Sequence, residues 1–277
     1  MLRTSALVCL IALAATVFAG CNFRTTRKGA PPTGPHFSVM TYNVNYGMPG
    51  AADAVGAIRE TDADIVCLQE ITPAWQRYLT AALSQRYPHR RYKHRGGAGG
   101  MGILSKRPFR DVAYTEPQAG WFPSWIIEAD TPLGPVHICN VHLRPPLSDR
   151  GSISPSAYMN TPEIHRREIA EAYGHMDSKR PRLVVGDFNE NDSGGGIAWL
   201  GKRGFTDALS QFDTSSNTWQ WRVGAITLRN RFDHILHSGN LHSTSAWVVA
   251  KGKSDHRPVV AIIERAGLAR DIGRVDR

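Results

Sequence analysis

Acidic, amide and imidazole side chains stand where several apolar segments of this 277-residue chain begin or end. Each segment has the length and composition of a buried strand, and loops at strand ends can gather side chains on a rigid scaffold. A lone Glu or His in such a place is usually structural, but the same coincidence at six strands favours one shared site. The residues concerned are Asn43, Glu70, His142, Asp187, Asn189, Asp233, Asp255 and His256.

The spacing of these residues adds some geometry. Asp187 and Asn189 are two positions apart at the end of "RLVVGDFN", so we expect both side chains on the same face. Asp255 and His256 are adjacent in "KGKSDHRPVVAIIE", and a regular strand would send them to opposite sides. Both can serve one site only if they lie in the turn before Pro258. Proline is tolerated as the first residue of a strand, so we expect the strand to begin at Pro258.

The set combines carboxylates, amides and two imidazoles, with no candidate Ser or Cys nucleophile. Oxygen ligands without cysteine favour a hard cation, Mg²⁺ or Mn²⁺. Such a cation beside an Asp-paired His suits hydrolysis of a phosphate ester, because the cation neutralises oxygen charge while a base activates water.

Strands and helices are expected to alternate early in the chain, and strands to cluster later, as in a layered α/β sandwich with one domain. A polar loop is expected over residues 144–160 before a helix near Thr161, and a basic, Gly-rich loop over residues 89–100. Thr72 is expected to cap a helix with Pro73 in its first turn. Strands are expected at residues 37–47, 63–71, 101–105, 125–130, 136–143, 182–189, 232–238, 244–250 and 258–263, and helices at 51–60 and 72–88.

Seven motifs in the order of the chain resemble the endonuclease/exonuclease/phosphatase superfamily, which includes deoxyribonuclease I. They are "TYNVNYG", "IVCLQEI", "GILSKRP", "NVHL", "GDFN", "RFDHIL" and "SDHRPVV". The resemblance extends from Phe37 to Glu264 and implies an α/β (α+β) four-layer sandwich, in which two packed mixed β-sheets are flanked by helices. It also implies an enzyme that hydrolyses phosphoric esters with the help of a divalent metal.

The resemblance implies a metal site for Mg²⁺ (or Mn²⁺). Glu70 would be the principal ligand, aided by Asn43 and Asp255. Asn45 stands where some nucleases of the superfamily carry a metal-binding Asp, so a second metal ligand is not expected there.

The resemblance also implies catalytic roles. His256 would act as general base or as donor to a phosphoryl oxygen, and Asp233 would orient it. Asp187 would position or deprotonate the attacking water, and Asn189 would hold that water or a phosphoryl oxygen. His142 would bind phosphate or assist the leaving group. Water would then attack phosphorus in line with the leaving oxygen.

The formal net charge of +9 favours anionic partners, although a solvated basic surface is the alternative. Nucleic acid is the favoured substrate, because "HRRYKHRGG" is basic and "NTWQWR" is rich in aromatic residues that could stack on bases. For Trp219 and Trp221 the alternative, slightly favoured, is packing against a strand. A phospholipid or another small phosphoester is the alternative, as in sphingomyelinases or inositol phosphatases. A surface module without catalysis is disfavoured, because every motif position keeps a competent residue.

The N-terminus predicts export. Arg3 is followed by an apolar run, and residues 1–20 read as a signal peptide. Residues 18–21, Phe-Ala-Gly-Cys, resemble the lipobox of bacterial lipoproteins, with Phe18 where Leu is usual. Lipidation of Cys21 would anchor the protein to a bacterial membrane, in the periplasm or at the cell surface; cleavage nearby without lipidation is the alternative.

The remaining boundaries follow from these two resemblances. Residues 21–35 are expected to form a tether, 36–265 the catalytic domain and 266–277 a C-terminal tail. We expect a monomer. Cys67 and Cys139 lie in apolar runs and are expected to be buried, and the spacing leaves open a disulfide between them.

Overall fold

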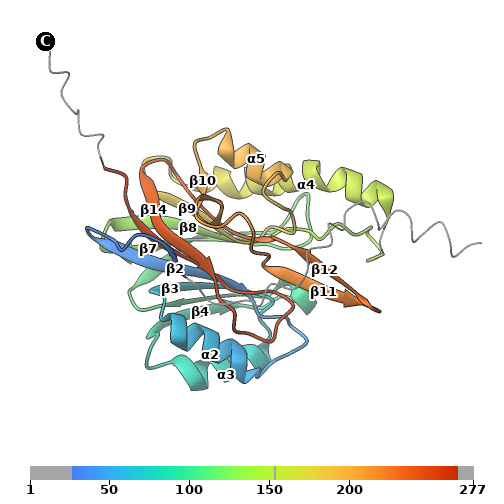
Figure 1. Ribbon diagram of the computed structural model, residues 1–277, viewed down its shortest axis with the longest axis horizontal. Helices are drawn as coiled ribbons and strands as arrows, with labels where there is room; N and C mark the ends of the chain where they lie inside the picture. The colour runs from blue at the N-terminus through green and yellow to red at the C-terminus, as the bar shows by residue number, and fades with distance from the viewer. Residues whose placement is uncertain (1–26, 153, 268–277) are drawn as a thin grey trace, which may run out of the picture.

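The computed structural model describes residues 27–152 and 154–267 (Figure 1). The predicted signal peptide and Cys21 lie outside these residues. Two large mixed sheets pack face to face, with two α-helices against the outer face of each (Figure 1). This arrangement confirms the predicted four-layer sandwich.

The first sheet has seven strands, and α2 (Ala52–Thr61) and α3 (Pro73–Leu83) cover its outer face. Its central strands β2 and β3 run parallel, while the other neighbours run antiparallel. In spatial order the strands are β1 (Lys28–Gly29), β14 (Leu241–Val248), β15 (Val259–Arg265), β2 (His36–Asn43), β3 (Ile65–Gln69), β5 (Met101–Ser105) and β4 (His89–Lys93).

The second sheet has six strands, and α4 (Pro155–Gly174) and α5 (Gly195–Gly201) cover its outer face. Here β8 and β9 are the parallel pair. In spatial order the strands are β10 (Thr206–Asp207), β13 (Asp233–His237), β9 (Arg182–Asp187), β8 (Gly134–His142), β7 (Ser124–Thr131) and β6 (Phe109–Thr115). A separate hairpin, β11 (Trp219–Val223) and β12 (Ile226–Asn230), projects from the body beside them (Figure 1).

Alternation along each strand divides the apolar side chains among three buried clusters. On β2, Val39 faces the core between the sheets, whereas Met40 faces α2 and α3. Cys67 belongs to the inter-sheet core and Cys139 to the cluster under α4 and α5, and both are free. The predicted burial of the two cysteines is therefore confirmed, without a disulfide.

Thr72 caps α3 as expected: its Oγ1 accepts the backbone N–H of Trp75 at 3.2 Å. Two other expectations are wrong. The expected loop over residues 89–100 contains strand β4, and α4 begins at Pro155, so that Pro162 lies inside the helix instead of at its start. β6 and α5 were not expected from the sequence either.

The predicted tether over residues 21–35 falls partly within the described chain, where it is bound to the first sheet. Lys28 and Gly29 pair with β14, and the backbone N–H groups of Thr33 and Gly34 donate to Glu264. Among the described residues, no helix combines the length and the apolar character needed to span a membrane.

Candidate active site

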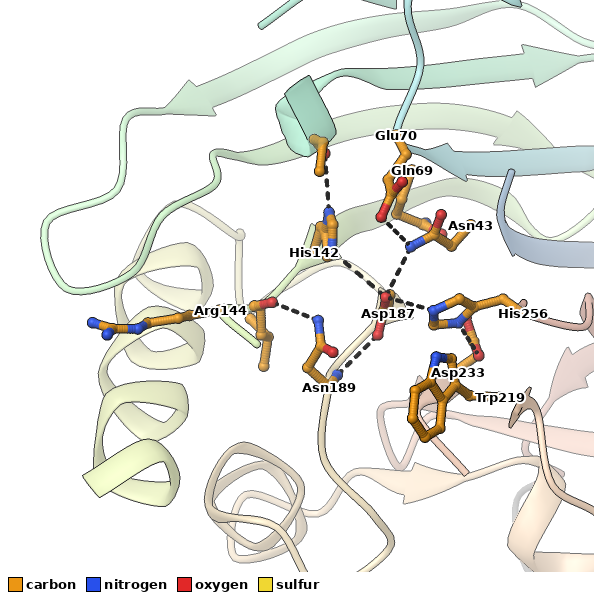
Figure 2. Close-up of polar contacts among 12 residues, drawn as sticks. Asn43, Gln69, Glu70, His142, Arg144, Asp187, Asn189, Trp219, Asp233 and His256 are labelled. Atoms are coloured by element: carbon orange, nitrogen blue, oxygen red, sulfur yellow. Dashed lines mark hydrogen bonds and ion pairs between the residues drawn. The ribbon is translucent and has the colours of Figure 1, made fainter. Parts of the chain in front are cut away.

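Strand register brings the predicted site residues to one end of the two sheets. In the second sheet Asp187 lies opposite His142 on β8 and opposite Asp233 on β13. Side chains in register point to the same face of a sheet, so these three form a row. In the first sheet Asn43 lies opposite Gln69, directly before Glu70. Because the sheets face each other, the two rows meet in the space between them (Figure 2).

Asn43 links the two sheets. It is almost fully buried, and its Nδ2 donates to Oε1 of Glu70 at 2.9 Å and to Oδ2 of Asp187 at 3.0 Å. Its Oδ1 accepts the backbone N–H of Asn45, and the second Glu70 oxygen accepts the backbone N–H of Tyr46. The two carboxylates therefore lie on either side of one amide group.

Oδ2 of Asp187 is surrounded by nitrogen atoms. Besides the amide of Asn43, Nε2 of His256 lies 3.4 Å away and Nε2 of His142 lies 3.5 Å away (Figure 2). Burial raises the pKa of Asp187, against the opposing charges of His256 and His142. A carboxylate with a raised pKa accepts a proton from water more readily than an ordinary Asp.

His256 is held by Asp233, whose Oδ2 lies 2.9 Å from its Nδ1. Burial alone would lower the pKa of His256, but the carboxylates of Asp233 and Asp187 outweigh it and raise the pKa to about 10. Nδ1 donates to Asp233 and Nε2 lies 3.4 Å from Asp187, so the ring is an imidazolium whose Nε2–H group is not fixed by a hydrogen bond among the described residues. Among the described residues, Oδ1 of Asp233 has no hydrogen-bond partner.

His142 differs from His256 in its protonation. Its Nδ1 donates to the carbonyl of Ala98 at 3.2 Å, and its ring stacks on Phe122 with centroids 4.2 Å apart. Burial lowers the pKa of His142, against the charge of Asp187. The ring is therefore neutral at pH 7, with an unprotonated Nε2 toward Asp187.

Asp255 is fixed by two donors from different segments. Nδ2 of Asn45 donates to its Oδ1 at 2.9 Å, and Nε1 of Trp219 donates to its Oδ2 at 3.2 Å. Asp255 and His256 lie in the turn before β15, as expected, and that turn is held by Ser254, whose Oγ donates to the carbonyl of Asn43 at 2.8 Å.

Two site residues leave the strand direction through left-handed backbone. Glu70 has φ 65° and Asn189 has φ 49°, a left-handed conformation that is uncommon for residues other than glycine. In a regular strand Glu70 would point away from the space between the sheets, because neighbouring Gln69 points into it and contacts Asn140. Asn189 donates from its backbone N–H to Oδ1 of Asp187 and from its side chain to the carbonyl of Leu143. The expectation that Asp187 and Asn189 project from one strand face is wrong, because β9 ends at Asp187 and Asn189 lies in the turn that follows.

All eight predicted residues lie together at this end of the two sheets, but the positions that hold them were not found from the sequence. Thr218 accepts the backbone N–H groups of Phe232 and Asp233 with its Oγ1. Gln69 donates to Asn140 at 2.7 Å across the sheets. Asn140 could have been found from the sequence, because a single amide within the apolar run "VHICNVHL" indicates a buried side chain that needs a hydrogen-bond partner.

The family model described as "Endonuclease/Exonuclease/phosphatase family" matches residues 40–256, most of the chain. The chain belongs to this family. No curated protein sequence matched the chain. Members of this family are phosphoesterases, so a hydrolase acting on phosphoester bonds is supported.

Solved structures share the fold at low identity. TDP2 from D. rerio, complexed with single strand DNA product, is 18% identical with a TM-score of 0.63 over 83% of this chain and 99% of that chain. An endonuclease/exonuclease/phosphatase from Beutenbergia cavernae is 19% identical with a TM-score of 0.64, covering 84% and 72%. ANGEL2, a 2',3'-cyclic phosphatase, is 14% identical with a TM-score of 0.63, covering 87% and 98%.

Family phosphoesterases typically use a divalent metal, and the donor chemistry here fits one. Burial raises the pKa of Glu70, against hydrogen bonds from Asn43 and Tyr46, and the nearby charge of Asp255 raises it further. The carboxylates of Glu70 and Asp255 repel each other, and a bound cation would relieve this repulsion. Asn43, by contrast, turns its N–H group toward Glu70, so its predicted role as a ligand stays a prediction.

Proposed function

We propose that this protein is a divalent-metal-dependent phosphodiesterase that cleaves nucleic acid by in-line attack of water. The observation that carries the proposal is the cluster around Asp187, where one carboxylate oxygen lies within 3.5 Å of an imidazolium and of a neutral imidazole. Such a cluster offers both a proton acceptor and a cationic hydrogen-bond donor to one phosphate.

The protonation states give Asp187, His256 and His142 different roles in the reaction. Asp187 takes the proton of the attacking water, as the oxygen–phosphorus bond forms and the bond to the leaving oxygen breaks. His256, already protonated, donates a hydrogen bond to a phosphoryl oxygen, while Asp233 keeps it oriented and charged. His142, with an unprotonated Nε2, accepts a hydrogen bond from water or substrate, and Asn189 fixes the rotamer of Asp187.

Glu70 and Asp255, with Asn43 beside them, would hold Mg²⁺ or Mn²⁺. When bound, the cation would neutralise charge on the phosphate and on the leaving oxygen. The preference for a hard cation rests on the oxygen donors, since both cysteines of the described chain are buried away from the site.

Nucleic acid as the substrate is supported by partly exposed aromatic side chains on two sides of the Asp187 cluster. Trp219 contacts Asp255 on one side and Phe122 stacks on His142 on the other. Planar side chains of this kind suit nucleobases flanking a phosphate. The net charge of +9 agrees with a polyanionic substrate, and TDP2, of similar fold, has been seen with single-stranded DNA.

A substrate panel tests the proposal. The purified protein is incubated with single-stranded DNA, plasmid DNA, RNA, sphingomyelin vesicles and inositol phosphates, with Mg²⁺, Mn²⁺ or EDTA. We expect metal-dependent cleavage of nucleic acid, abolished by EDTA and in His256→Ala. Absence of nucleic-acid cleavage with every metal would contradict the proposal.

The hairpin β11–β12 favours a second candidate, a phosphoesterase that acts on phospholipid. Its register places Trp221 opposite Leu228 and Val223 opposite Ile226 on one face. Trp221, Val223 and Ile226 are 55%, 52% and 56% exposed, so this apolar face is open to solvent beside the site. An exposed apolar patch beside an active site marks a binding surface, and a lipid interface is one occupant. The hairpin is short, and none of the long apolar type is apparent in the sequence.

We further propose that the protein is exported and held at a bacterial membrane through lipidated Cys21. This is supported by the apolar N-terminal run and the lipobox-like residues 18–21. Metabolic labelling with a fatty-acid analogue tests it: label should enter the wild type and not Cys21→Ser.

A further inference from the structure

Glu190, the residue after Asn189, is held from two sides by buried histidines that the catalytic mechanism does not use. Nδ1 of His165 on α4 lies 2.8 Å from Oε2 of Glu190. Nε2 of His234 on β13 lies 3.0 Å from the backbone carbonyl of Glu190. Both histidine side chains are completely buried. We call His165, Glu190 and His234 the Glu190 clamp.

The partners of both rings fix their charge. The other nitrogen of His165 lies 2.6 Å from the carbonyl oxygen of Arg144, and the other nitrogen of His234 lies 3.1 Å from Oδ2 of Asp207. Carbonyl and carboxylate oxygens only accept hydrogen bonds, so each ring must donate from both nitrogens. A ring that donates twice is an imidazolium, and the clamp therefore contains two buried cations.

The surrounding charges agree with this assignment. Around His165 lie Glu190 and the buried Glu168, which accepts the backbone N–H of Arg144. Burial alone would lower the pKa of His165, but the hydrogen bond and charge of Glu190 raise it above its ordinary value. Around His234 lie Asp207 and, at 3.9 Å, Asp192, which also pairs with Arg231.

The clamp joins the two loops that carry catalytic side chains. His165 spans from Glu190, three residues after Asp187, to the carbonyl of Arg144, two residues after His142. The side chain of Asn189 makes a parallel link to Leu143 at 2.9 Å. Oε1 of Glu190 accepts the backbone N–H of Ile197, so α5 is also hydrogen-bonded to Glu190.

We propose that His165 and His234 are positioning residues, which as imidazoliums hold Glu190 and thereby fix Asp187, Asn189 and His142 relative to one another. The catalytic consequence rests on the proposed function. The charge state of the two rings does not rest on it and is tested separately.

The first experiment is ¹⁵N NMR of the wild type labelled at histidine, at pH 7, with assignment by His165→Phe and His234→Gln. We expect both nitrogens of both rings to be protonated. A neutral tautomer at either ring would overturn the proposal. This measurement stands even if the wild type hydrolyses no phosphoester, an outcome that would contradict the proposed function alone.

The second experiment compares kinetics and thermal unfolding of His165→Phe with those of His137→Phe. His137 is also buried, at the opposite end of β8, where its Nδ1 accepts the backbone N–H of Asp177. We expect His165→Phe to lower kcat on single-stranded DNA by about 10-fold to 100-fold with KM changed less than about 3-fold, because small misplacements of catalytic groups are costly. His137→Phe should lower Tm without this loss of kcat.

Two results would overturn the positioning role. One is a folded His165→Phe with kcat within about 2-fold of wild type, far less than misplaced groups cause. The other is an equal loss of kcat in the control, which would mark a general effect of stability. Glu190→Gln adds a graded variant, because its amide can donate to a neutral His165 that still donates to Arg144. Its kcat should lie between those of wild type and His165→Phe. If His165→Phe does not fold, Glu190→Gln also assigns the His165 signals, because only His165 contacts the Glu190 side chain, and an unchanged kcat in Glu190→Gln would overturn the positioning role.

Discussion

At the scale of single residues, Asp233 is expected to support activity through its contact with His256. Its Oδ1 is buried without a partner among the described residues, while Oδ2 keeps His256 charged and oriented. In Asp233→Asn the amide cannot support an imidazolium in the same way. We expect kcat to fall by about 10²-fold to 10⁴-fold, the usual contribution of a positioned acid or base. Tm should also fall, because buried His256 loses the carboxylate that most strongly stabilises its charged form.

Steady-state kinetics and calorimetry on the same preparation check this expectation, with Asp177→Asn on the surface as the control. Loss of kcat only at temperatures where Asp233→Asn is already unfolded would show that Asp233 acts mainly in folding.

The metal ligands are tested without relying on activity. Calorimetric titration with Mn²⁺ should show binding to the wild type and at least about 10-fold weaker binding to Glu70→Gln, because a neutral amide is a poorer ligand for a hard cation. Asn43→Ala should weaken binding less, since its N–H group faces Glu70 in the structure. Equal affinities for wild type and Glu70→Gln would place the cation elsewhere.

The residues that lie together at the site could be predicted from the sequence, because each stands at an end of a buried strand and parallel strands end at a common edge. The contacts between these residues could not be predicted. The bond from Asn43 to Asp187 spans 144 positions, and the stacking of Phe122 on His142 depends on how a surface loop folds back. Neither leaves a local pattern. The protonation states of the two catalytic histidines likewise follow from contacts with Asp233 and Ala98.

At the scale of secondary-structure elements, the missed ones have identifiable reasons. β4, "HRRYK", lies at the edge of the first sheet, and its long polar side chains show no alternation. Charged residues are common on edge strands because they discourage pairing with another chain. α4 was expected too late because Pro162 resembles a helix start, whereas the first-turn proline is Pro155.

The contact between α4 and α5 is tested with two glycines of one helix. A Cβ at Gly195 would lie 1.9 Å from the carbonyl oxygen of Pro162, whereas a Cβ at Gly201 would meet no atom within 4 Å. We expect Gly195→Ala to lower the free energy of unfolding by about 1–3 kcal/mol through overpacking. Gly201→Ala should be neutral or stabilising by up to about 1 kcal/mol, from helix propensity.

Chemical denaturation of both variants checks this pair of expectations. If Gly195→Ala were as stable as Gly201→Ala, the two helices would not pack as closely as described.

The two faces of the β11–β12 hairpin distinguish the candidate substrates. Val223→Ser with Ile226→Ser removes apolar area from one face, while Arg222→Ser with Arg229→Ser removes charge from the other. For a nucleic-acid enzyme we expect the arginine pair to raise Kd for single-stranded DNA and the aliphatic pair to have little effect. Cosedimentation with phosphatidylcholine vesicles that is lost in the aliphatic pair would instead favour the phospholipid alternative.

At the scale of the whole molecule, buried histidines link folding to pH. Burial alone would lower the pKa of His234, but the charge and hydrogen bond of Asp207 raise it from 6.5 to about 9. A group whose folded pKa exceeds its unfolded pKa binds its proton more tightly in the native state. Its contribution is therefore complete below pH 6.5 and is lost as the pH rises through about 9.

We therefore expect the free energy of unfolding of the wild type to fall by on the order of 1–3 kcal/mol between pH 6.5 and pH 9.5 on account of this ring. His234→Gln should lower stability at pH 6.5 and flatten the profile, because glutamine has no proton to lose. His242→Gln is the control, since that side chain is 43% exposed and should leave the slope unchanged. Urea unfolding at four pH values measures all three proteins. A wild-type slope retained in His234→Gln would show that His234 is neutral in the folded protein, in conflict with its two acceptor partners.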